Sequence, residues 1–151
     1  MDLSDLELAK RLMLAALLGG VLGFEREWHH KAAGLRTNIL IALGAALFTL
    51  MSIELAGFNG NGDPTRVASQ IVTGIGFLGA GAIMRTNAGI QGLTTAAAIW
   101  VNAAIGVACG GGRYHLAFIA TGVTLVVLIA LPVIEAGFDR FRPKDTSATG
   151  S

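Results

Sequence analysis

Residues 63–85 read DPTRVASQIVTGIGFLGAGAIMR, an apolar run with too many glycines and polar side chains to face lipid on all sides. A helix over residues 64–84 would be roughly 30 Å long at about 1.5 Å per residue, which matches the hydrocarbon thickness of a bilayer. Asp63 and Pro64 supply an N-cap and a first-turn proline, which indicate where the helix begins. We therefore expect a membrane-spanning helix here, with the rest of the chain organised around it.

This helix is expected to have one polar face and two smooth faces. At about 100° per residue, one side carries Asp63, Arg66, Gln70, Thr73, Gly74, Phe77 and Gly81, with Gly76 and Gly79 nearly opposite. In lipid, helices associate through close packing and polar contacts, because apolar side chains gain little by leaving an apolar solvent. We therefore predict that Gly74, Gly76, Gly79 and Gly81 are helix-packing positions and that Arg66 and Gln70 point into a bundle.

Composition predicts a membrane protein. Of the 151 residues, 53% are apolar and 14% are charged, and the mean hydropathy of +0.64 is far above that of an ordinary soluble domain. The formal net charge of +1 argues against nucleic-acid binding, because no basic face is dense enough to displace many counterions. The one cysteine, Cys109, excludes an intrachain disulfide and is expected to be a small packing residue.

Five apolar runs separated by short polar breaks predict an all-α fold, a five-helix transmembrane bundle within residues 1–135. The expected spans are residues 8–24, 35–53, 64–84, 93–109 and 114–134. The first run also resembles a signal-peptide core, but no small-residue cleavage site follows it. Its Gly19 and Gly23 form a GxxxG pair, which favours close helix packing. Residues 136–151 are expected to form a polar, disordered tail.

The distribution of Lys and Arg predicts the orientation of the bundle. With five spans, one side of the membrane holds Lys10, Arg11, Arg66 and Arg113. The other side holds Arg26, Lys31, Arg36, Arg85, Arg140, Arg142 and Lys144. Because the side richer in Lys and Arg is cytoplasmic, we expect the N-terminus outside and the C-terminus inside.

Polar side chains gather at the expected outer end of the bundle. Glu54, Asp63 and Gln70 offer oxygen atoms of the kind that a hard cation such as Mg²⁺ prefers, so Glu54 and Asp63 are candidate metal ligands. Arg66 lies nearby inside a span, where an ionisable residue is a functional candidate. The alternative is that Asp63 caps its helix and pairs with Arg66 while Glu54 is simply solvated.

At the expected inner end, Glu25, Arg26 and Arg36 are functional candidates, and the alternative is an interface anchor held by local ion pairs. His29 and His30 are adjacent, so one helical face cannot present both rings to a metal, and a zinc site is not expected.

A seam of small and polar residues is expected on one face of the run at 93–109. Its members are Thr95, Ala98, Asn102 and Gly106. We expect this seam to pack on the 63–85 helix, with Asn102 hydrogen-bonding across the interface.

No catalytic motif is found. The run at 74–79 satisfies G-x-G-x-x-G, but a dinucleotide site needs a preceding strand and a later acidic residue, and this motif lies within a helix. No nucleophile elbow, P-loop or Ser or Cys with a plausible base is present. We therefore expect no enzyme activity and no cofactor, apart from Mg²⁺ as a candidate ion.

Four ordered motifs resemble the membrane domain of the MgtC/SapB family over roughly residues 8–135. They are LLGGVLGFERE at 17–27, GLRT at 34–37, the 63–85 stretch and GLTTAAAIW at 92–100. The resemblance implies a bacterial inner-membrane protein with five spans and an outside N-terminus. It also implies a link to growth at low Mg²⁺ and, in some members, to survival within host cells.

Several polar residues match positions of the family pattern. Asp63 is the acidic residue before Pro-Thr-Arg, and the other matches are Glu25, Arg26, Arg36, Arg66, Gln70 and Arg85. Longer members continue into a soluble C-terminal domain, whereas about sixteen residues follow the expected fifth span here. Gln91 stands where a basic residue is common, which weakens any role for that turn.

Three functions are compatible with these residues. The favoured one is a regulator that docks its glycine-rich faces onto a partner membrane protein in the bilayer, because paired mid-membrane carboxylates and broken helices typical of transporters are not found. The alternative is direct transport of Mg²⁺ or another ion by a self-oligomer. In the third, the polar residues only stabilise the fold.

Overall fold

The computed structural model describes residues 3–58, 63, 65–87 and 89–139 of the chain. Five helices account for most of this part: α1 (Asp5–Trp28), α2 (Leu35–Phe58), α3 (Thr65–Gly81), α4 (Leu93–Gly110) and α5 (Tyr114–Asp139). The prediction of an all-helical chain with five helices is therefore confirmed. Segments Leu35–Gly57, Leu93–Gly110 and Tyr114–Glu135 are long and apolar enough to span a membrane.

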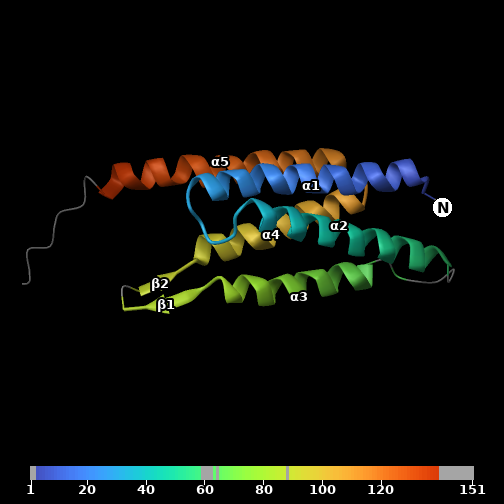
Figure 1. The fold of residues 1–151 in the computed structure, drawn as a ribbon, viewed down its shortest axis with the longest axis horizontal. Helices are drawn as coiled ribbons and strands as arrows, with labels where there is room; N and C mark the ends of the chain where they lie inside the picture. Colours follow the sequence, from blue (N-terminus) through green and yellow to red (C-terminus); the bar gives the residue numbers. More distant parts are fainter. Residues whose placement is uncertain (1–2, 59–62, 64, 88, 140–151) are drawn as a thin grey trace, which may run out of the picture.

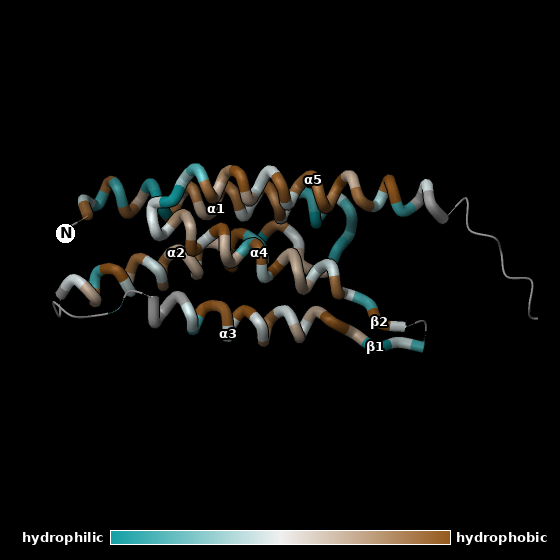
Figure 2. Tube along the Cα trace, turned by 180° about the vertical axis from the view of Figure 1, so that it is seen from behind, coloured by the Kyte–Doolittle hydropathy of each residue, from teal (hydrophilic) through white to brown (hydrophobic). Residues whose placement is uncertain are grey.

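The five helices run side by side along one long axis (Figure 1). Helices α1 and α5 lie along one edge of the bundle, α2 and α4 occupy the middle, and α3 lies at the opposite edge. Hydrophobic residues run along the lengths of the helices, and hydrophilic residues gather at several of their ends (Figure 2). This distribution is the one expected of helices whose flanks meet hydrocarbon and whose ends meet water.

Helices α2 and α4 occupy the middle of the bundle and α3 lies at its edge, so the expectation that residues 63–85 form the hub is wrong. A Cβ atom on Gly19 or Gly23 of α1 would lie 2.7–2.8 Å from atoms of α2, and the predicted GxxxG contact is therefore present. On α4, a Cβ on Gly106 would collide with the carbonyl oxygen of Ala42, and one on Gly110 would lie 2.6 Å from that of Ala46. Glycines thus allow both neighbours to approach the α2 backbone.

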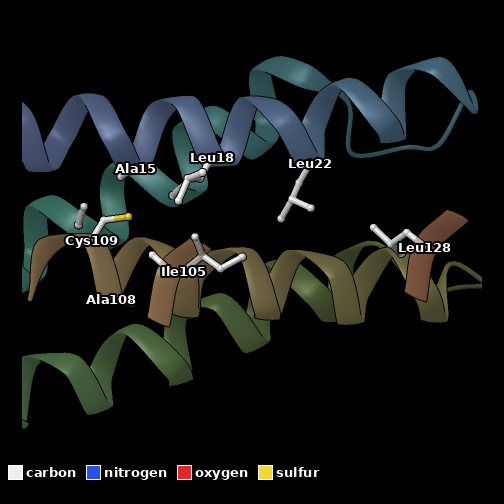
Figure 3. Packing of buried hydrophobic residues seen from close by; sticks show 10 residues of the cluster. Ala15, Leu18, Leu22, Ile105, Ala108, Cys109 and Leu128 are labelled. Carbon is white, nitrogen blue, oxygen red and sulfur yellow. The ribbon is translucent and has the colours of Figure 1, made fainter. Parts of the chain in front are cut away.

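Apolar side chains from four helices fill the main core. It combines Ala15, Leu18 and Leu22 of α1, Ala42 and Ala46 of α2, Ile105, Ala108 and Cys109 of α4, and Ala117 and Leu128 of α5. Leu18 and Leu22 point toward α4, and Ile105 points back toward α1 (Figure 3). Cys109 is fully buried and unpaired, in agreement with the expected packing role.

Helix α3 ends earlier than the sequence pattern predicts. It stops at Gly81 and a two-stranded antiparallel hairpin follows, with β1 (Met84–Thr86) and β2 (Gly89–Gln91) where a helix end and a simple turn were expected. Gly89 and Gly92 have φ values of +116° and +89°, a region that favours glycine. A Cβ at Gly92 would also collide with the carbonyl oxygen of Ala82, so the chain can double back here only with glycine.

Three other helices are longer than their expected apolar runs. Helix α1 begins at Asp5 after the N-cap Ser4, α2 extends to Phe58, and α5 continues to Asp139. Helical hydrogen bonding continues past the point where side chains become polar, because the backbone ladder does not depend on hydropathy. The predicted tail beyond Asp139 lies outside the described residues.

Candidate functional site

A buried ion pair lies at the end of the bundle where α1 leads into α2. Glu25 and Arg26 are 6% and 3% exposed, and the guanidinium binds the carboxylate through Nε to Oε2 at 2.5 Å and Nη2 to Oε1 at 2.9 Å. Nδ1 of His29 lies 3.1 Å from the same carboxylate. Removing either partner of such a pair would leave an uncompensated buried charge, which is strongly destabilising.

The two adjacent histidines terminate α1. The backbone N–H of His30 donates to the carbonyl of Glu27 at 3.0 Å, and that of Lys31 donates to the carbonyl of Arg26 at 2.9 Å. These bonds form a Schellman motif with His30 in the left-handed region at φ 52°. The motif gives His30 a backbone role in ending the helix.

The loop between α1 and α2 is held by side chains from both helices. Oε2 of Glu27 accepts a bond of 2.7 Å from the backbone N–H of Leu35 and so caps α2. A Cβ at Gly34 would collide with that carboxylate, so Gly34 admits the cap. The amide of Asn38 donates to the carbonyls of Ala33 at 2.7 Å and Gly34 at 3.0 Å. This network fixes the path of the loop.

Asn102 joins α4 to α2 at the centre of the bundle. Its Nδ2 donates to the carbonyl oxygen of Asn38 at 2.7 Å and to Oδ1 of Asn38 at 3.0 Å. The expected hydrogen bond across a helix interface is present, but its partner is α2 and not the 63–85 helix. Gly106 of the same seam also packs on α2. Oδ1 of Asn102 is buried without a hydrogen-bond partner.

A second polar network, which the sequence did not predict, lies at the other end of the bundle. Arg11 donates to Oε1 of Glu7 at 3.1 Å and to the carbonyl of Gly110 at 2.9 Å, near the C-terminus of α4. The hydroxyl of Tyr114 also donates to Glu7, and Nζ of Lys10 lies 5.0 Å from the centre of the Tyr114 ring. The available signals were the Glu7 and Arg11 spacing and the glycine turn that precedes Tyr114.

These contacts lower the pKa of Glu7 below its ordinary value of 4.5. The main cause is the bond from Tyr114, followed by the bond from Arg11, since both stabilise the ionised carboxylate. Nearby Lys10 acts in the same direction, and burial opposes the shift. Glu7 thus ties the starts of α1 and α5 and the end of α4 together.

The polar residues expected at the outer end lie within or on either side of the segment that joins α2 to α3. Glu54, Asp63 and Gln70 are exposed, and the side chain of Arg66 lies outside the described part of the chain. No group of three His, Cys, Asp or Glu residues that could hold a metal ion occurs in the described ranges. The assignment of Glu54 and Asp63 as metal ligands therefore stays a prediction.

The remaining basic candidates lie near the opposite end. Arg36 is exposed in the first turn of α2, beside the Glu27 cap, and Arg85 is exposed on β1 opposite Ile90. The structure thus brings Glu25 and Arg26 into contact, whereas Arg36 and Arg85 remain on the surface.

The glycines of α3 have different surroundings. A Cβ on Gly79 would make ordinary contact with Ala96 of α4 at 3.8 Å, but one on Gly74, Gly76 or Gly81 would meet nothing within 4 Å. Gly74 borders a groove of about 400 Å³ between α2 and α3. Gly76 and Gly81 therefore have open space beside them, whereas Gly74 borders the groove and Gly79 contacts α4.

Long apolar helices with glycine-mediated packing and polar networks at both ends define a helical membrane protein. The chain belongs to the MgtC family, whose family model matches residues 12–136.

Several curated relatives are named Protein MgtC. The one from Brucella abortus (strain 2308) is 51% identical over 122 residues, which cover 80% of this chain and 50% of the relative. The one from Salmonella choleraesuis is 45% identical over 139 residues, which cover 92% of this chain and 57% of the relative. The chain thus spans about half the length of these relatives. No solved structure shows a significant match.

Proposed function

We propose that this chain crosses a bacterial inner membrane five times and acts in Mg²⁺ homeostasis by regulating a partner membrane protein. The orientation proposed has the N-terminus outside and the C-terminus inside, as the Lys and Arg distribution predicts. Family membership and three long apolar helices support the membrane setting, and the resemblance described above supports the link to Mg²⁺.

The proposal of a docked partner rests on the outward face of α3. Ile71 and Gly79 are buried and Ile75 is partly buried, so this line of α3 faces the bundle. Gln70 and Thr73 are exposed on the other side. An amide facing hydrocarbon is unfavourable, whereas a second protein could satisfy it and pack closely on the open glycines.

Docking can be tested with a leucine at an open glycine. Gly76→Leu places a large side chain where nothing of this chain lies within 4 Å, so the bundle should fold while the partner is excluded. Gly122→Leu on α5 is a matched control, because Gly122 is also open. We expect crosslinking and co-purification from native membranes to lose a partner with Gly76→Leu only. Equal recovery with both variants would contradict docking through α3.

The alternative is direct transport of Mg²⁺ or another ion by an oligomer, with Glu54 and Asp63 near its entrance. Both carboxylates are exposed, beside the segment between α2 and α3. Purified protein in liposomes with a Mg²⁺-sensitive dye separates the two functions. Mg²⁺ flux that Asp63→Asn abolishes, with folding unchanged, would support transport and contradict the regulator.

The topology has its own test. A reporter that is active only in the cytoplasm should be active when it is fused after Ser151. A reporter that is active only in the periplasm should be inactive at the same position. The opposite pattern would contradict the orientation without affecting the family assignment.

A further inference from the structure

A cavity of about 540 Å³ lies between the end of α1 and the C-terminal half of α5. Its lining has a basic part and an apolar part. The basic part consists of Arg26, His29 and Lys31. The rest consists of Leu128, Ile129, Pro132, Val133 and Gly137. A ligand that fills this space must therefore combine an anionic group with apolar surface.

The charge available to a ligand comes mainly from Lys31. Arg26 is already paired with Glu25, and the same carboxylate contacts His29. Lys31 is exposed and forms no ion pair with any side chain that the structure describes. Glu135 of α5 is exposed but does not line the cavity. The basic part thus carries an excess positive charge.

An aromatic pair indicates the depth of the basic part in the membrane. Trp28, next to His29, is 72% exposed, and its ring lies 5.9 Å from that of Phe24. Exposed tryptophans at helix ends are typical of the headgroup region. Leu128, which also lines the cavity, belongs to the buried core. The basic part of the cavity therefore lies at headgroup depth, beside the apolar residues of α5.

We propose that this cavity binds one anionic phospholipid of the surrounding bilayer. The phosphate would contact Lys31 and His29, and an acyl chain would lie along the apolar wall of α5, with Val133 at its surface. Basic pockets between membrane helices are suited to anionic headgroups because each basic side chain attracts the negative lipid. The chain's own residues 140–144 carry three basic residues and no acidic one, so like charge disfavours them as the occupant.

The test uses the full chain in detergent micelles, with bound lipid counted by native mass spectrometry. Wild-type protein should retain phosphatidylglycerol at least about tenfold better than phosphatidylcholine. Lys31→Gln should weaken phosphatidylglycerol retention about fivefold, the factor that corresponds to about 1 kcal/mol for one basic side chain at an anionic surface. Lys10→Gln is the matched control, since Lys10 is an exposed lysine at the other end of α1. It should leave retention unchanged.

A second variant tests the apolar wall. Val133 is 71% exposed, so Val133→Trp should preserve the fold, measured as an unchanged unfolding temperature, while filling the acyl position and removing lipid retention. Equal retention of the two lipids, equal effects of the two lysine variants, or full retention by Val133→Trp would each overturn the proposal. Displacement of the lipid by millimolar glycerol 3-phosphate would also overturn it, because a free anion would then be the ligand. None of these outcomes depends on docking through α3.

Discussion

Replacement of Asn102 by leucine should have effects of different size in two backgrounds. In the wild-type chain, the amide of Asn102 donates two hydrogen bonds to Asn38, at 2.7 and 3.0 Å, and neither side chain is more than 1% exposed. Asn102→Leu removes both bonds and leaves Oδ1 of Asn38 buried without this donor. In an Asn38→Leu background, the amide of Asn102 loses the Oδ1 acceptor but keeps its bond to the backbone carbonyl of residue 38, so its replacement by leucine removes one bond instead of two.

The size of the effect follows from the number of bonds. Interhelical hydrogen bonds in membrane proteins contribute about 0.6 kcal/mol on average and up to about 1.7 kcal/mol. Two bonds from one amide therefore predict a loss of about 1–2 kcal/mol for Asn102→Leu in the wild-type chain. In the Asn38→Leu background, the same substitution should cost about 0.6 kcal/mol less, because only the bond to the backbone carbonyl of residue 38 remains to be lost.

The measurement is reversible unfolding by SDS in mixed micelles, followed by circular dichroism, for the wild type, both single variants and the double variant. Thr121→Val is the control, because the hydroxyl of buried Thr121 donates only to Ala117 of its own helix, at 2.8 Å, and should not couple to Asn38. If Asn102→Leu changes the free energy of unfolding equally in both backgrounds, within about 0.3 kcal/mol, the side-chain hydrogen bond between Asn102 and Asn38 is refuted.

Three further predictions concern the ends and the packing of the bundle. His30→Gly should raise the free energy of unfolding by up to about 1 kcal/mol, because glycine adopts the positive φ more easily, and a lower value in SDS titration would contradict the helix end described. Gly106→Ala should lower the free energy of unfolding by about 1–3 kcal/mol through overpacking against α2, whereas Gly122→Ala, in open space, should leave it unchanged. Equal effects of the two substitutions on the free energy of unfolding would contradict this packing. Tyr114→Phe should raise the pKa of Glu7. Because folding lowers the pKa of Glu7, this carboxylate stabilises the folded state above pH 4.5, and the stabilisation is lost at lower pH. The free energy of unfolding of the wild type should therefore exceed that of Tyr114→Phe at pH 6, and the difference between them should shrink below pH 4.5. A difference independent of pH would exclude the Glu7 contact.

Hydropathy and helix signals in the sequence were sufficient to find the five helices. Apolar runs bounded by glycine, proline and charged breaks locate helices even without partners, because backbone hydrogen bonds are satisfied within each helix. The ends were less accurate: α3 stops at Gly81, and the hairpin that follows depends on Gly92 lying against Ala82. That contact is between segments and has no signature in hydropathy.

The candidate site was predicted in part. Glu25 and Arg26 were singled out by their charge, and the structure shows them as a buried pair, whereas the contact of Glu7 with Tyr114 joins residues 107 positions apart and was missed. Spacing rules apply within one helix, so they can relate Glu7 to Arg11 but not to a residue of another helix.

The 63–85 stretch shows the same division. Its amino acids alone determined that it forms a helix with a polar, glycine-rich face, since side-chain periodicity along a helix is set by local geometry. Only the tertiary structure decided that this helix lies at the edge and that α2 and α4 occupy the middle, because glycines on α1 and α4 let those backbones approach α2 more closely. Glycine spacing indicates that a helix can be approached closely, but the choice of neighbour depends on shape complementarity among all five helices.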